Sequence, residues 1–457
     1  MFPAMTSSNL KHIPQNKKKN RNFQKQFNLC TCDHWSLTTP PGLYLHVPFC
    51  HSKCTYCDFY SITDCNLIPD WLAALEKEAA LYQDRFGVFD TLYLGGGTPS
   101  LLNPGQLASL LESLRRGFSF SPDTEATLEA NPDDLTPEKL RLYGDLGINR
   151  LSVGVQSFND RELAFLGRRH SARQTLAALD AARAAGFANL SLDLIYGLPG
   201  QSLEDWKKTL EQALVFHPEH LSCYQLTYEP GTPLGRKKVQ GKVVAATEEE
   251  ERAFFLFTSR FLEERGYLHY EISNFARLGE TGNQPNYQVI DNEESFNRRP
   301  KTEDRKPYFS QHNRKYWRHL PYLGLGPGAH SFLDGVRWWN VASVRQYCRT
   351  LARGEAPLAG REVLSPEQLR LEAFYLGLRT REGVPLKLLQ DIPGWEKTLT
   401  DLQKSGLVEV RQGRAVPTRM GFLLADSLPL YFMDADMEEN MTVNREHLSS
   451  WPLAPDP

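Results

Sequence analysis

Residues 43–57 of the chain read LYLHVPFCHSKCTYC. The first five residues of this stretch predict a short β-strand. The remainder places Cys50, Cys54 and Cys57 in a Cys-x3-Cys-x2-Cys spacing. Three cysteines cannot all be paired with one another, and no secretory signal precedes them, so a disulfide framework does not fit. The stretch therefore predicts a metal-binding or catalytic thiol site directly after a strand.

Strand-like and helix-like segments alternate from this stretch onward. The predicted strands are Leu43–Val47, Thr91–Leu94, Ala126–Glu129, Leu151–Val155, Leu190–Ile195 and Leu221–Thr227. The predicted helices between them are Asp70–Leu81, Gly105–Leu114, Pro137–Leu146, Ala172–Ala185 and Leu203–Val215. Such alternation requires right-handed crossovers and a parallel sheet. Six repeats predict an α/β fold whose sheet is a closed or partly closed barrel.

The rest of the chain divides by composition. Helical patterns followed by a short hairpin near the C-terminus predict a winged-helix-like module, and a polar stretch before residue 312 predicts an inserted loop. The first residues are basic and lack an apolar period, which predicts disorder, with an organelle-targeting peptide as the alternative. The expected segments are a basic extension at 1–40, the barrel at 41–276, the polar loop at 277–311, a barrel-associated segment at 312–360, the winged-helix-like module at 361–432 and an acidic tail at 433–457.

Composition excludes two classes of protein. The 457 residues carry 52 Lys plus Arg against 55 Asp plus Glu, a net charge of −3. That balance argues against a protein whose whole surface grips nucleic acid or an acidic membrane. No apolar run reaches the roughly 18 residues that a membrane-spanning helix needs. We therefore expect a cytoplasmic protein with no membrane span and no nucleic-acid partner.

The three cysteines fit an iron–sulfur cluster. Such clusters are usually held by four thiolates, so three thiolates on one loop leave one iron open to chelate a small molecule. A zinc site completed by His51 or Cys65, or a redox pair formed by Cys54 and Cys57, is the alternative.

Residues 44–50, which read YLHVPFC, and the cysteine loop together resemble the radical S-adenosylmethionine (SAM) superfamily. They are similar in particular to the branch that contains oxygen-independent coproporphyrinogen III oxidases and HemW-type haem chaperones. The resemblance runs from about residue 42 to 432. It implies a partial (β/α)6 TIM-like radical SAM barrel, a 4Fe-4S cluster on the three cysteines, and SAM on the open iron.

Several polar or glycine positions match the SAM contacts of this family. The segment Gly95–Pro99 follows the second predicted strand, where glycines would leave backbone N–H groups bare for a ligand. The acidic and amide positions lie at or beyond the carboxyl ends of later strands, where barrel active sites lie. On the residues alone each is as well explained as a structural group. The resemblance implies SAM-binding or cluster-side roles for Tyr44, Gly96, Gly97, Thr98, Glu129, Gln156, Arg168 and Asp193.

The run at residues 312–317, HNRKYW, resembles the haem-associated motif of the HemW branch. Haem iron accepts His or Tyr as an axial ligand, and His312 and Tyr316 lie one helical turn apart. The motif implies haem binding there, with a structural histidine as the alternative. The glycine-rich run Gly324–Ala329 is expected to be a loop at the barrel mouth without a preceding strand.

The residues after the cluster loop separate the two branches. Oxidases of this family carry a fourth cysteine two positions beyond the third, whereas Cys57 is followed by Asp58 and Phe59. The resemblance therefore favours a HemW-type chaperone that transfers haem to an acceptor protein such as a respiratory cytochrome, with an electron-donor reductase and a homodimer as further expectations. Coproporphyrinogen III oxidation is the alternative, and a radical SAM enzyme that modifies RNA is the third. Whether the chain catalyses a reaction stays open at this point.

Overall fold

A curved parallel sheet forms the centre of the protein. The structure is a computed structural model that describes residues 39–83, 85–279 and 306–432. Its six consecutive parallel strands are β1 (Gly42–Val47), β2 (Phe89–Gly96), β3 (Phe120–Ala130), β4 (Arg150–Gln156), β5 (Leu190–Tyr196) and β6 (His220–Gln225). All six lie where the strand–helix alternation predicted them, so the α/β prediction is confirmed.

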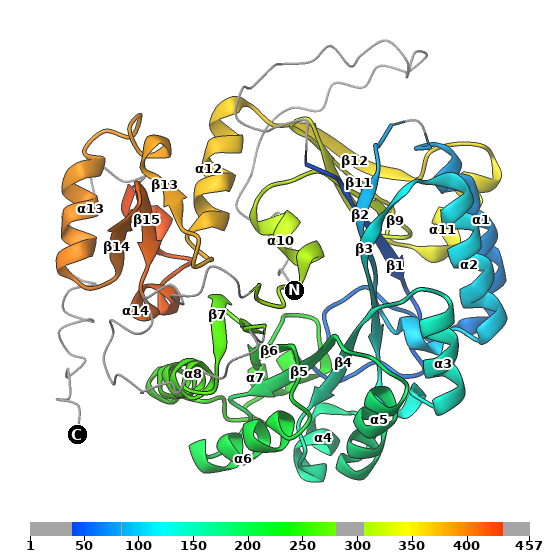
Figure 1. The fold of residues 1–457 in the computed structure, drawn as a ribbon, viewed down its shortest axis with the longest axis horizontal. Coiled ribbons are helices and arrows are strands. Elements are labelled where there is room, and N and C mark those ends of the chain that lie inside the picture. The colour runs from blue at the N-terminus through cyan, green and yellow to red at the C-terminus, as the bar shows by residue number, and fades with distance from the viewer. Residues whose placement is uncertain (1–38, 84, 280–305, 433–457) are drawn as a thin grey trace. The chain divides into compact units, whose positions relative to one another are not determined.

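The helices between these strands lie along the outer side of the sheet (Figure 1). They are α1 (Ile68–Ala80), α2 (Pro104–Gly117), α3 (Pro137–Asp145), α4 (Asp160–Leu166), α5 (Ala172–Ala184) and α6 (Leu203–Leu214). Capping explains several of their starts. The Asn103 side chain accepts from the backbone N–H of Gln106, and the Gln106 side chain accepts from the backbone N–H of Asn103; Ser171 and Ser202 form the same capping box in α5 and α6. Only the short α4 was missing from the sequence prediction.

Further strands extend the sheet at both edges. Next to β6 lie β8 (Asn274–Arg277) and β7 (Tyr267–Glu271), preceded by the helices α7 (Pro233–Val239) and α8 (Glu248–Glu263). Next to β1 lie β9 (Tyr322–Leu325), β10 (His330–Leu333), β11 (Val336–Asn340) and β12 (Leu358–Val363). The order is β12-β11-β10-β9-β1-β2-β3-β4-β5-β6-β8-β7. The sheet is therefore an open, partial barrel.

Two expectations for this region are corrected. The glycine-rich run at 324–329 begins inside a strand, because Gly324 and Leu325 are the last residues of β9, which pairs in parallel with β1. The predicted start of the C-terminal module, residue 361, falls inside β12, which pairs with β11 of the large sheet. Both differences arise because these edge strands are short and depend on their partners, β1 for β9 and β11 for β12, more than on their own sequence.

The C-terminal module has its own small core. It contains α12 (Pro366–Gly377), α13 (Trp395–Lys404), α14 (Arg419–Leu423) and a three-stranded sheet of β13 (Val384–Pro385), β15 (Arg414–Pro417) and β14 (Val408–Arg411). Phe374, Leu399 and Leu428 are buried together inside it. A buried ion pair connects it to the barrel, because Arg419 donates to Glu263 of α8 at 2.7 Å.

Two helices complete the barrel region. α11 (Val344–Ala352) packs on α1, whereas α10 (Gln311–Trp317) lies on the inner side of the sheet (Figure 1). The predicted basic extension at 1–40, polar loop at 277–311 and acidic tail at 433–457 lie largely outside the described residues.

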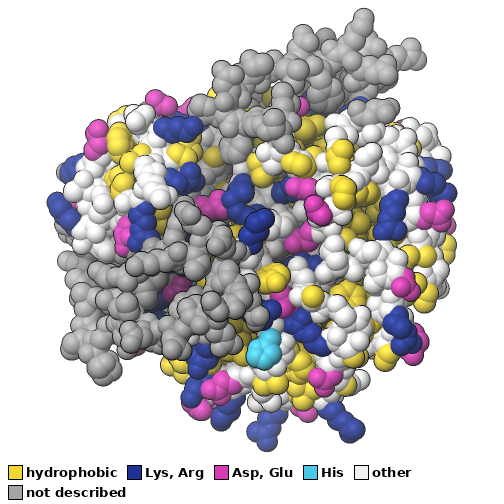
Figure 2. All heavy atoms as spheres, viewed as in Figure 1, with side chains coloured by type: hydrophobic (Ala, Val, Ile, Leu, Met, Phe, Trp, Pro, Cys, Tyr) yellow, Lys and Arg dark blue, Asp and Glu magenta, His cyan; other side chains and the backbone are white. Residues whose placement is uncertain are grey.

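The surface carries both signs of charge. Figure 2 shows Lys and Arg side chains interspersed with Asp and Glu over the described part of the visible face. This distribution agrees with the nearly balanced composition. Within the described ranges, no helix combines the length and the apolar composition that crossing a bilayer requires.

Candidate functional site

The cysteine loop begins where β1 ends, at the carboxyl edge of the sheet. Its first residues are held by the neighbouring strand, because Gly97 and Thr98 donate their backbone N–H groups to the carbonyls of Val47 and Phe49, both at 2.8 Å. Further along, Cys50 donates to the carbonyl of Ile62 at 3.0 Å. The loop is thus fixed at both ends by backbone hydrogen bonds. Its cysteine side chains are all half-buried and carry free thiols.

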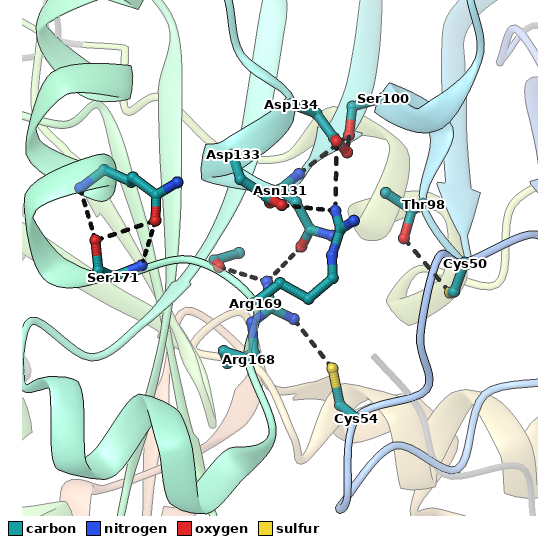
Figure 3. Close-up of polar contacts among 12 residues, drawn as sticks. Cys50, Cys54, Thr98, Ser100, Asn131, Asp133, Asp134, Arg168, Arg169 and Ser171 are labelled. Atoms are coloured by element: carbon teal, nitrogen blue, oxygen red, sulfur yellow. Dashed lines mark hydrogen bonds and ion pairs between the residues drawn. The ribbon is translucent and has the colours of Figure 1, made fainter.

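Two side chains from other loops point at the cysteine sulfurs (Figure 3). The Thr98 hydroxyl donates to the Cys50 sulfur at 3.4 Å, and the Arg168 guanidinium donates to the Cys54 sulfur at 3.4 Å. Burial, and then the nearby Cys54 and Cys50, raise the pKa of the Cys57 thiol to about 11. Crowded sulfurs that disfavour one another's charge, together with donors aimed at them, suit a cationic group bound by thiolates.

The same geometry distinguishes a cluster from a single ion. Within the described residues, no three His, Cys, Asp or Glu side chains converge closely enough to hold one metal ion. A cubane cluster is larger and takes each thiolate on a separate iron, so its ligands need not converge on one point. The arrangement of Cys50, Cys54 and Cys57 is therefore one that a cluster can take.

The glycine loop at 95–97 packs against the cysteine loop rather than exposing free amides. Gly96 has φ +109°, and a Cβ there would lie 2.5 Å from the ring of His46. A Cβ on Gly97 would lie 2.6 Å from the carbonyl oxygen of Phe49. The amides of Gly96 and Gly97 already donate to Glu129 and Val47. The expectation that these N–H groups are bare is corrected, since the glycines are needed for close approach of the two loops.

Two acids lie inside the barrel on β3 and β5, the two strands that flank β4. Glu129 accepts from the Tyr93 hydroxyl at 2.9 Å and from the Gly96 amide at 3.1 Å. Burial, and then the charge of Asp193, raise the pKa of Glu129 to about 7. Burial likewise raises the pKa of Asp193, whose carboxylate accepts from the Ser152 hydroxyl at 3.3 Å. The two acids share one environment, as acidic groups with a common ligand would.

Gln156 and Arg168 meet over a glycine. Gln156 ends β4 with a left-handed φ of 66°. A Cβ on Gly154 would lie 2.9 Å from the Gln156 amide nitrogen and 3.1 Å from the Arg168 guanidinium. Gly154 thus leaves the space in which the two side chains approach each other. The sequence analysis did not single out Gly154, although a glycine inside a predicted strand is a signal of close approach.

Three further residues near the cysteines were also missed. Asn131, directly after β3, accepts from Arg168, and its backbone N–H donates to the Ser100 hydroxyl at 3.1 Å. Ser100 in turn donates to Asp134 at 2.7 Å. The turn signal Asn131-Pro132 marks this loop in the sequence, but nothing local shows that the loop reaches Arg168.

The proposed haem ligands lie at the other end of the strands. His312 of α10 contacts Thr91 near the start of β2, with 2.8 Å between the threonine oxygen and Nδ1, while Nε2 lies 2.9 Å from the Tyr316 hydroxyl. The side chain is 1% exposed. Burial, and then the charges of Lys315 and Arg150, lower the pKa of His312 to about 3, so the ring is neutral. Both ring nitrogens are occupied, so iron coordination requires one of these hydrogen bonds to open.

Tyr44 lies between the two ends. Its hydroxyl is 3.0 Å from Nδ1 of His46, beside the cysteine loop. Its ring centre is 6.2 Å from those of both Tyr93 and His312. The predicted SAM-binding and haem-binding residues are therefore joined through aromatic contacts within the barrel.

Known proteins resemble the chain along most of its length. Residues 44–213 match the Radical SAM superfamily, and residues 364–424 match the HemN C-terminal domain. The Heme chaperone HemW of Mycobacterium tuberculosis (strain ATCC 25618 / H37Rv) is 36% identical over 397 residues, which cover 85% of this chain and 94% of that protein. The Heme chaperone HemW of Bacillus subtilis (strain 168) is 34% identical over 396 residues, covering 84% and 97%.

The chain belongs to the HemW family. A similar relative from Danio rerio is named Radical S-adenosyl methionine domain-containing protein 1, mitochondrial, and is 31% identical over 87% of this chain and 88% of its own length. Membership of the radical SAM superfamily implies a 4Fe-4S cluster and SAM.

A solved structure supports both domains of this HemW family member. Coproporphyrinogen III oxidase (HemN) from Escherichia coli matches with a TM-score of 0.68 and 26% identity, over 86% of this chain and 90% of that one. The shared fold includes the barrel and the C-terminal domain. The predicted fold class is thereby confirmed. The assignment to HemW rather than to the oxidases rests on sequence identity.

Proposed function

We propose that this chain is a haem chaperone that holds a 4Fe-4S cluster on Cys50, Cys54 and Cys57 and binds SAM beside it. The observation that carries the proposal is the cysteine loop, two of whose three sulfurs accept hydrogen bonds from Thr98 and Arg168 of other loops. When bound, a cluster and SAM supply one-electron reductive chemistry.

The residues around the loop would orient SAM. Glu129 and Asp193, whose pKa values are raised by burial, would accept hydrogen bonds from its hydroxyl or amino groups. Gln156 and Arg168 would meet its polar edges, with Arg168 suited to the carboxylate. The glycines at 96 and 97 contribute by letting the two loops approach closely.

Haem would bind at α10. His312 is neutral, which is the form that ligates iron, and Tyr316 holds its Nε2. We propose that the Tyr316 hydroxyl moves away when His312 coordinates haem. A haem-accepting protein, a reductase that supplies electrons, a homodimer and a cytoplasmic location belong to the same proposal.

Anaerobic reconstitution tests the cluster and the activity together. Protein loaded with iron and sulfide should contain labile sulfide, bind haem, and leave coproporphyrinogen III unchanged. Cys54→Ser should lose the cluster, whereas Cys348→Ser, at a half-buried thiol on α11, should retain it. Formation of protoporphyrinogen IX would instead assign the chain to the oxidase alternative.

Haem titration of three variants tests the ligand. His312→Ala should weaken haem binding, and Tyr316→Phe should retain or strengthen it because Nε2 is then released. Thr91→Val is the control for loss of local structure. It removes the buried contact to Nδ1 that His312→Ala also removes, but it keeps the imidazole ring of His312. Equal affinity of wild type and His312→Ala would remove His312 as the ligand.

A further inference from the structure

Two loops deliver one hydrogen-bond donor each to two different cysteine sulfurs. Thr98 follows the glycine loop after β2 and donates to Cys50, whereas Arg168 follows α4 and donates to Cys54. The donors differ in charge, since one is a hydroxyl and the other a guanidinium. They come from separate parts of the sequence, so tertiary packing must place them together.

One buried serine connects the two loops (Figure 3). Ser100, two residues beyond Thr98, is 0% exposed. It accepts from the backbone of Asn131, and the Asn131 side chain accepts from Arg168. Ser100 therefore connects the loop that carries Thr98 to Asn131, which accepts from Arg168, so that a movement of one loop displaces the other.

Two adjacent arginines near Ser100 have different kinds of partner. Arg169 takes the carboxylates, at 2.7 Å from Asp133 and 3.4 Å from Asp134. Arg168 instead donates to neutral oxygens, the Asn131 side chain and the Gly154 carbonyl at 2.8 Å. Within the described residues, no carboxylate pairs with Arg168. Its positive charge therefore acts on the Cys54 sulfur and on the Tyr56 hydroxyl.

We infer that Arg168 and Thr98 set the reduction potential of the bound cluster, with Ser100 as the residue that positions both. The inference rests on the cluster proposed above. Reduction adds one electron from an external reductant to the cluster and breaks no bond. A cation and a hydrogen bond at the thiolates stabilise the more negative, reduced form, which raises the potential.

The test is a redox titration of the reconstituted full chain with dithionite, followed by the cluster's electron paramagnetic resonance signal, without SAM. Arg168→Gln should shift the reduction equilibrium about tenfold toward the oxidised form, which for one electron is about 59 mV to more negative potential. Thr98→Val should shift it in the same direction by less, because a neutral donor is lost. Arg168→Lys, which keeps the charge, should recover part of the shift.

Controls separate this inference from the cluster itself. Arg173→Gln removes the same charge from an exposed position on α5 and should keep the wild-type potential. Wild-type protein that builds no cluster would overturn both the proposed function and this inference. A normal cluster whose potential is unchanged in Arg168→Gln and Thr98→Val would overturn the inference alone. Loss of the cluster in all three site variants would also overturn it, because the donors would then serve assembly.

Discussion

Glu78 is a carboxyl group enclosed by three different elements. It lies on α1 and is 0% exposed. The backbone N–H of Gly326 donates to it at 2.8 Å, and the side chains of Asn340 and Tyr347 donate as well. Burial outweighs these three donors and raises its pKa from 4.5 to about 7. The group therefore makes the stability of the barrel depend on pH.

The sign and size of the effect follow from the direction of that shift. Below pH 4.5 Glu78 is protonated in both the folded and the unfolded chain, so no charge is buried. As the pH rises through 7, the folded chain must bury a carboxylate that the unfolded chain exposes to water. The free energy of unfolding should fall by about 2 to 3 kcal/mol between pH 5 and 8 through this group alone.

Urea unfolding at constant ionic strength, followed by circular dichroism between pH 5 and 8, measures this contribution. Glu78→Gln cannot ionise, so its stability relative to wild type should rise by the stated amount across the range. Glu76→Gln is the matched control, because that side chain is 63% exposed on the same helix, and it should keep the wild-type pH dependence. Identical pH slopes for wild type and Glu78→Gln would refute the reasoning.

Two other substitutions give sharp expectations. Gly97→Ala puts a Cβ 2.6 Å from the carbonyl oxygen of Phe49. It should lower the free energy of unfolding by about 1–3 kcal/mol and reduce the iron content after reconstitution. Gly105→Ala is the control, because the nearest atom to its Cβ is 3.6 Å away, and it should leave the iron content unchanged. Arg419→Gln removes one of the two arginines that pair with Glu263, the other being Arg381, and should destabilise the contact between barrel and C-terminal module by about 1.5–3 kcal/mol, seen as an earlier transition in calorimetry; a single unshifted transition would contradict it.

Much of the central fold could be predicted because its signals are local. The strands β1 to β6 alternate along the chain with helices, and caps such as Asn103 mark where helices begin. Parallel strands require crossovers, so the alternation implied the topology as well. The edge strands β9 to β12 were not foreseen individually, because short strands depend on their partners more than on their own composition.

The site shows the same division. The spacing of Cys50, Cys54 and Cys57 is a property of the sequence, since ligands on one loop stay together whatever the rest of the chain does. Arg168 was predicted as a contact of SAM, but its approach to the Cys54 sulfur depends on Asn131, from another loop. A sequence pattern cannot show that two loops meet.

Sequence by itself determined the parallel α/β core, the thiolate loop and the family, because each is written in neighbouring residues. Only the tertiary structure decided the burial and the polar partners of the charged and titratable side chains. In the folded chain both nitrogens of His312 are hydrogen-bonded and Glu78 is buried among three donors. The nearby carboxylates pair with Arg169 rather than with Arg168. Electrostatic effects of this kind depend on distance and burial, which exist only once segments far apart in the chain have packed together.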